Sequence, residues 1–136
     1  MLNRALFKIS VALIAAIVCS TGVDAKEIFE GLWALTHADC ADEEGPNSRT
    51  LIDLTNVVRG KSVPIFDQYE NHCRIEKKAA FGDSLTLSVT CFEFWEEFEK
   101  GVTSRQIIVK LTPIKGGLEI DGKPYLRCAT KRPKGR

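Results

Sequence analysis

Four of the five cysteines constrain the fold of this 136-residue chain more than any other feature. They are Cys40, Cys73, Cys91 and Cys128. His37 and His72 lie close to two of them, but the paired C-x₂₋₄-C spacing that is usual in zinc sites is missing. Two disulfides are typical of a small domain that folds outside the reducing cytosol. The cysteines therefore predict a stapled domain, with no metal site and no cofactor.

The first 25 residues have the layout of a secretory signal peptide. Arg4 and Lys8 form a positive region, residues 9–18 form an apolar run, and residues 23–25 form a small-x-small cleavage pattern. The run is shorter than the roughly 20 residues that a membrane-spanning helix needs. Val18 is too bulky for a lipoprotein signal at Cys19. We expect cleavage after Ala25 and a periplasmic or secreted protein without membrane attachment.

The expected mature chain forms one domain, residues 26–130, with a basic disordered tail at 131–136. After loss of the signal, 17 basic and 17 acidic residues remain. Four of the basic residues lie in the tail "KRPKGR", which leaves residues 26–130 with a formal charge of −4. A mildly acidic body predicts no nucleic-acid partner.

Short segments separated by turn residues predict an all-β fold. Asp121-Gly122 is typical of a two-residue hairpin turn. Because all the connections are local, the simplest architecture is an up-and-down antiparallel barrel or half-barrel of about eight strands. The expected strands are 28–36, 49–55, 62–69, 72–80, 84–92, 103–114, 118–120 and 124–130.

The hairpin formed by residues 72–92 has a defined register. Leu85, Leu87, Val89 and Cys91 alternate with polar residues, so the odd positions are expected to face inward. A three-residue loop at 81–83 would place Ile75 opposite Val89, Lys77 opposite Leu87 and Cys73 opposite Cys91. This register favours the disulfides Cys73–Cys91 and Cys40–Cys128. The pairing Cys40–Cys73 with Cys91–Cys128 remains open, because the chain-closure entropy sums to about 8 kcal/mol for every pairing.

The segment "CFEFWEEFEKG", residues 91–101, marks a change of structure. The apolar period changes here from 2 toward 3.6, which predicts a short helical turn near 93–100. Trp95 and Phe98 would pack as a lid over one end of the barrel, with the glutamates in solvent. The alternative is a partner-facing acidic aromatic patch. Its candidate residues are Glu93, Phe94, Trp95, Glu96, Glu97 and Phe98.

The sequence contains no catalytic signature, and we therefore predict no catalytic residue and no enzyme. Nucleophile-elbow, zinc-helix and phosphate-loop motifs are all missing. Oxidised cysteines cannot act as nucleophiles. The adjacent pairs Glu43-Glu44 and Glu96-Glu97 are interpreted as solvated charges, since neighbouring carboxylates rarely converge on one bond.

The motif Gly31-Leu32-Trp33 resembles the G-x-W signature of lipocalins. The resemblance implies a barrel whose tryptophan plugs the closed end, covered by an arginine from the last strand, here Arg127. Guanidinium groups stack well on indole rings. The motif also resembles that of the Inh-type metalloprotease inhibitors, which are compact eight-stranded barrels.

Over nearly the whole mature chain, the pattern GxW…C…YExxC…C…YxRC is similar to a set of small exported disulfide-stapled β-barrel proteins of Gram-negative bacteria. These have no assigned activity, so the resemblance implies the fold and the compartment and no active site. Gly31, Trp33, Arg127, Tyr69 and Glu70 are expected to be structural. Tyr69 would be a half-buried ring, and Glu70 would cap nearby amides.

The sequence thus predicts a binding protein. The first hypothesis is a binder or inhibitor of an exported hydrolase, with a basic partner such as lysozyme suited to the acidic segment 93–99. The second is a carrier of a small apolar ligand, which requires an open barrel interior. The third is a hydrolase, which requires His37 or His72 within reach of a carboxylate in a cleft.

Overall fold

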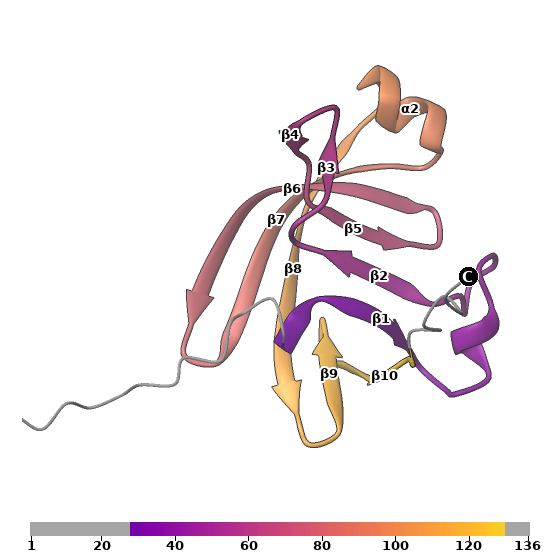
Figure 1. The fold of residues 1–136 in the computed structure, drawn as a ribbon, viewed down its shortest axis with the longest axis vertical. Helices are drawn as coiled ribbons and strands as arrows, with labels where there is room; N and C mark the ends of the chain where they lie inside the picture. The colour runs from indigo at the N-terminus through magenta and orange to yellow at the C-terminus, as the bar shows by residue number, and fades with distance from the viewer. Residues whose placement is uncertain (1–27, 130–136) are drawn as a thin grey trace, which may run out of the picture.

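The computed structural model describes residues 28–129, and within this range it contains a closed eight-stranded antiparallel β-barrel (Figure 1). The barrel strands follow one another in chain order, β1-β2-β5-β6-β7-β8-β9-β10, and β10 pairs with β1 to close the ring. The predicted all-β up-and-down barrel is therefore confirmed. The predicted signal peptide (1–25) and basic tail (131–136) lie outside the described residues.

The barrel strands agree in number with those expected from the sequence. They are β1 (Gly31–Ala34), β2 (Thr50–Asp53), β5 (Ile65–Gln68), β6 (Asn71–Phe81), β7 (Ser84–Phe92), β8 (Arg105–Ile114), β9 (Gly117–Ile120) and β10 (Lys123–Arg127). A second small hairpin was not predicted. It comprises β3 (Val57–Val58) and β4 (Lys61–Ser62). The remaining elements are a short 3₁₀ turn, η1 (Asp39–Ala41), and the helix α2 (Trp95–Lys100).

Turn chemistry explains where several strands end. Asp121 and Gly122 both have positive φ, 48° and 83°, as a type I′ hairpin turn requires, and Ile120 pairs with Lys123 across them. The unpredicted β3–β4 hairpin turns in the same way at Arg59 and Gly60, with φ of 50° and 76°. No helix among the described residues is long and apolar enough to cross a membrane.

The barrel interior is filled by its own side chains. As predicted, the odd positions of β7 face inward, and Leu87 and Val89 are almost fully buried. Leu111 and Leu118, from β8 and β9, are likewise 0% exposed. A cavity of ligand size would leave its lining accessible to water, and these side chains have no such accessible surface. Their burial is the main stabilising term of the fold.

The β6–β7 hairpin corrects one part of the predicted register. Phe81 pairs with Ser84 across a two-residue turn, and Lys78, not Lys77, faces Leu87. An irregularity between Ile75 and Lys77 absorbs one residue of β6, which is the effect of a β-bulge. Beyond it the expected pairs return, with Ile75 opposite Val89 and Cys73 opposite Cys91.

Two disulfides join Cys73 to Cys91 and Cys40 to Cys128. This is the pairing that the register favoured, and the competing one does not occur. The first links neighbouring strands within the barrel wall. The second ties the end of β10 to the η1 turn, and it closes a sequence separation of 88 residues.

Trp33 is buried in the barrel core beneath Arg127. Its side chain is 2% exposed, and its indole N–H donates to the Phe29 carbonyl at 3.0 Å. The Arg127 guanidinium carbon lies 4.2 Å from the centre of the Trp33 ring. A Cβ on Gly31 would lie 2.7 Å from Arg127 Nη1, so a glycine at this position lets the arginine reach the Glu30 carbonyl.

The helix α2 packs against the outer wall of the barrel and does not form the expected lid over its end. Phe98 meets Phe92 edge to face at 5.6 Å between ring centres, and Phe92 is 1% exposed. Phe92 occupies an even position of β7, whose even side chains point outward. The helix therefore covers an apolar patch on the outer wall at β6 and β7, where α2 lies in Figure 1.

Candidate binding groove

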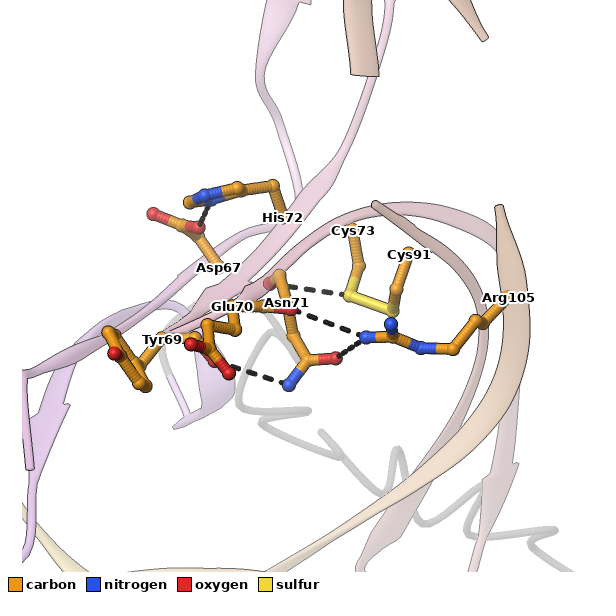
Figure 2. Close-up of a disulfide and its surroundings, with 8 residues drawn as sticks. All are labelled: Asp67, Tyr69, Glu70, Asn71, His72, Cys73, Cys91 and Arg105. Atoms are coloured by element: carbon orange, nitrogen blue, oxygen red, sulfur yellow. Dashed lines mark hydrogen bonds and ion pairs between the residues drawn. A yellow bond between two sulfur atoms is a disulfide. The ribbon is translucent and has the colours of Figure 1, made fainter. Parts of the chain in front are cut away.

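The β5–β6 turn forms the floor of the candidate site. Gln68 pairs with Asn71 across Tyr69 and Glu70, and Glu70 has a φ of 55°. Arg105 holds this turn from β8, because its Nη2 donates to the Glu70 carbonyl at 3.3 Å and to Asn71 Oδ1 at 2.7 Å. Figure 2 shows the turn beside the Cys73–Cys91 disulfide. The floor is thus fixed by a disulfide and by an arginine.

Tyr69 and Glu70 occupy the tip of the β5–β6 turn. The Tyr69 side chain is 43% exposed, close to the half-buried ring expected from the sequence, and Glu70 is exposed. The Glu70 carboxylate beside the Tyr69 hydroxyl raises the pKa of this phenol above its ordinary value. The two side chains therefore present a carboxylate and an aromatic ring to solvent.

The side chains of Asp67 and His72 form a pair next to the turn, and Trp95 packs on this pair. Asp67 and His72 are opposite each other on β5 and β6, and His72 Nδ1 lies 2.5 Å from Asp67 Oδ1 (Figure 2). The Trp95 ring stacks on the His72 ring, with 4.3 Å between their centres and 26° between their planes. The start of α2 is thereby attached to the end of the β5–β6 hairpin.

These elements and the β1–β2 loop enclose a groove of about 660 Å³, which we call the acidic groove. It is lined by three segments that are far apart in the sequence. The lining residues are Glu43, Glu44, Gly45, Ser48, Arg49, Asp67, Gln68, Tyr69, Glu70, His72, Glu93, Phe94 and Trp95.

The acidic groove combines negative charge with exposed aromatic rings. Its five carboxylates and one guanidinium give a formal charge of −4, with His72 counted as neutral. Arg49 neutralises only one carboxylate, through its ion pair with Glu43 at 2.6 Å. Phe94, Trp95 and Tyr69 are 56%, 43% and 43% exposed. Carboxylates beside open aromatic faces suit lysine and arginine side chains, which pair with the former and stack on the latter.

The structure divides the patch predicted at residues 93–98. Glu93, Phe94 and Trp95 line the acidic groove, whereas Glu96, Glu97 and Phe98 do not. Glu97 caps the start of α2 by accepting a hydrogen bond from the Phe94 amide at 3.3 Å. Phe98 packs on the barrel wall. Sequence reasoning missed the contributions of residues 43–49 and 67–72.

His37, the second histidine considered in the sequence, does not line the acidic groove. It is exposed and lines a neighbouring depression together with Cys40. Among residues 28–129, no group of three or more histidines, cysteines or acidic residues is arranged to hold a metal ion.

Burial of Asp67 gives a first prediction. Desolvation raises the pKa of this carboxyl, and the hydrogen bond to His72 opposes the rise. A raised pKa means that the folded state holds the proton on Asp67 more tightly than the unfolded chain does. Asp67 therefore stabilises the fold at pH values below its pKa in the unfolded chain, about 3.9. This contribution is lost as the pH rises through the pKa of Asp67 in the folded state. The stability of the wild type relative to Asp67→Asn should therefore fall as pH increases.

Urea unfolding at several pH values between about 3 and 6 measures this trend. Asp83→Asn, in the exposed β6–β7 turn, is the control and should follow the wild type. A wild-type advantage over Asp67→Asn that grows with pH would mean that the pairing with His72 outweighs burial.

Comparison with known proteins yields no relative for this chain. No family model, no curated protein and no solved structure matches it.

Proposed function

We propose that this chain is an exported binding protein whose acidic groove docks a basic partner protein, such as an exported hydrolase. The observation that carries the proposal is the groove itself, which joins four net negative charges to three exposed aromatic rings. Aromatic residues are enriched at protein interfaces, and complementary charge speeds encounter and orients docking. The function is binding, and no catalytic step is assigned to the chain.

The cysteines support a site of action outside the cytosol. Both disulfides join residues of the folded domain, and such bonds persist in oxidising compartments. Together with the signal-like residues 1–25, they favour a periplasmic or secreted location. Basic hydrolases such as lysozyme act in the same compartments.

The filled barrel does not favour the carrier alternative. A small apolar ligand needs an open pocket that buries most of its surface. The interior positions of this barrel hold side chains such as Phe66, Leu87 and Leu111, which are at most 1% exposed. Binding at the outer groove requires no such space.

The hydrolase alternative requires a histidine within reach of a carboxylate in a cleft, and the His72–Asp67 pair meets this condition. However, nucleophilic catalysis by such a pair also needs a hydroxyl within hydrogen-bond reach of the histidine. No serine or threonine hydroxyl among residues 28–129 is hydrogen-bonded to His72, and Trp95 covers one face of its ring. We therefore interpret the pair as the platform that positions Trp95 in the groove.

Charge reversal in the groove is predicted to weaken binding to lysozyme. In Glu70→Lys with Glu93→Lys, the dissociation constant measured by titration calorimetry should rise at least about tenfold, because two favourable contacts become repulsive. The titration is done at about 0.15 M salt, where the screening length is about 8 Å and distant charges contribute little.

Glu96→Lys with Glu99→Lys is the matched control. It makes the same change in net charge on α2, at positions that do not line the groove. Its dissociation constant should stay within about threefold of the wild type. Equal weakening in both variants would assign the effect to overall charge, and unchanged binding in the groove variant would refute the proposed site.

A further inference from the structure

The basic segment 130–136 starts next to the acidic groove. Cys128 is tied to Cys40 by a disulfide, and its amide donates to the Leu32 carbonyl at 2.8 Å, which fixes the end of the described chain. Ala129 then lies in a depression of about 650 Å³ that it shares with Glu43 and Arg49. The last described residue before segment 130–136 therefore has a defined position.

Glu43 and Arg49 also line the acidic groove, so the two hollows have a common edge. This edge is the Arg49–Glu43 ion pair. Glu43 and Arg49 thus line both the depression at Ala129 and the groove. Seven residues extend up to roughly 25 Å, so the segment can reach from Ala129 past this shared edge into the groove.

The charges of the segment and the groove match. Lys131, Arg132, Lys134 and Arg136 carry four positive charges within six residues. The groove has a formal charge of −4. It also offers the open faces of Trp95 and Tyr69, on which guanidinium and ammonium groups stack favourably.

We propose that segment 130–136 docks in the acidic groove of its own chain. The attachment at Ala129 gives the segment an effective concentration on the order of millimolar, so weak contacts suffice to occupy the groove for much of the time. A basic partner must then displace the segment, and only partners that bind more tightly gain access. This inference concerns the groove of the proposed function, but its test does not depend on lysozyme.

The test uses the indole N–H signals of the two tryptophans in a ¹H–¹⁵N spectrum. The exported chain is compared with a variant in which Lys131, Arg132, Lys134 and Arg136 are all changed to glutamine. The Trp95 signal should differ between the two proteins at about 0.05 M salt and converge near 0.5 M, where charges are screened. The indole signal of Trp33 should not move, because this ring is buried and its N–H is hydrogen-bonded to the Phe29 carbonyl.

Two controls exclude a general effect of charge. Changing Lys77, Lys78, Lys110 and Lys115 to glutamine makes the same charge change at exposed sites outside the groove, and should leave the Trp95 signal in place. A free peptide with the sequence TKRPKGR, added to the four-glutamine tail variant, should return the Trp95 signal toward its wild-type position.

Identical Trp95 signals in the wild type and the tail variant would overturn the inference. If lysozyme still bound through Glu70 and Glu93, the proposed function would be supported and docking of the segment would be refuted. If the Trp95 signal moved but lysozyme did not bind, docking of the segment would be supported and lysozyme would be excluded as the partner. Where both hold, the tail variant should bind lysozyme about threefold or more tightly than the four-lysine control does.

Discussion

Replacing Cys40 and Cys128 with serine is expected to lower the free energy of unfolding by about 4 to 5 kcal/mol, because the disulfide restricts a long loop of the unfolded chain. The sequence separation of 88 residues includes seven of the eight barrel strands. The same relation gives about 3 kcal/mol for Cys73–Cys91, whose separation is 18. Urea denaturation followed by tryptophan fluorescence measures the loss.

The control is Ala41→Ser with Ala129→Ser, which keeps both disulfides. It places hydroxyls at the exposed residues that follow Cys40 and Cys128, and should change the free energy of unfolding by less than about 0.5 kcal/mol. A loss below about 2 kcal/mol in the Cys40/Cys128 variant would show that the closure of this loop contributes little to stability.

Truncation of Trp33 to alanine is expected to destabilise the fold by about 3 to 5 kcal/mol, the usual cost of removing a buried large aromatic side chain. The ring is 2% exposed, and its loss would also leave the Arg127 guanidinium without its stacking partner. Trp95→Ala is a matched control, since this ring is 43% exposed. It should cost less than about 1.5 kcal/mol and should weaken lysozyme binding instead.

Urea unfolding of both variants separates the two roles. Trp33→Ala should lose stability, and Trp95→Ala should lose affinity for lysozyme. Comparable losses of stability in the two variants would mean that Trp33 is not the plug of the barrel.

The fold followed from local patterns in the sequence. The alternation of Leu85, Leu87 and Val89 determines which face of β7 is buried, and burial then specifies the register that brings Cys73 to Cys91. The bulge near Glu76 was missed because an extra residue in an exposed strand leaves no apolar signal. The β3–β4 hairpin was missed because its strands are two residues long, although Arg59-Gly60 was an available turn signal.

The acidic groove was only partly predictable. The composition of residues 93–98 suggested an acidic aromatic patch as an alternative to a lid, and of these residues Glu93, Phe94 and Trp95 line the groove. The loop at 43–49 and the hairpin at 67–72 were not identified, although the predicted register already indicated part of their proximity to Trp95. The register that sets Cys73 opposite Cys91 also sets His72 opposite Phe92, three residues before Trp95. The position of the 43–49 loop depends on the pairing of β2 with β5, for which no register was predicted.

The position of α2 has a comparable explanation. The change of period near Phe92 correctly predicted a short helix, but did not reveal which surface the helix would cover. Phe92 points outward from β7 and needs an apolar partner, and Phe98 provides it. The outer wall, and not the end of the barrel, is therefore where the helix packs.

The central claim is that a basic partner docks in the acidic groove, and a ¹H–¹⁵N spectrum recorded during titration with lysozyme tests it most directly. The Trp95 indole signal and the amides of residues 43–49, 67–72 and 93–95 should shift or broaden together. The amides of the β6–β7 hairpin tip, residues 78–83, should remain in place. Changes confined to that tip or to the exposed face of β8, with the groove signals unmoved, would show that lysozyme does not dock in the groove.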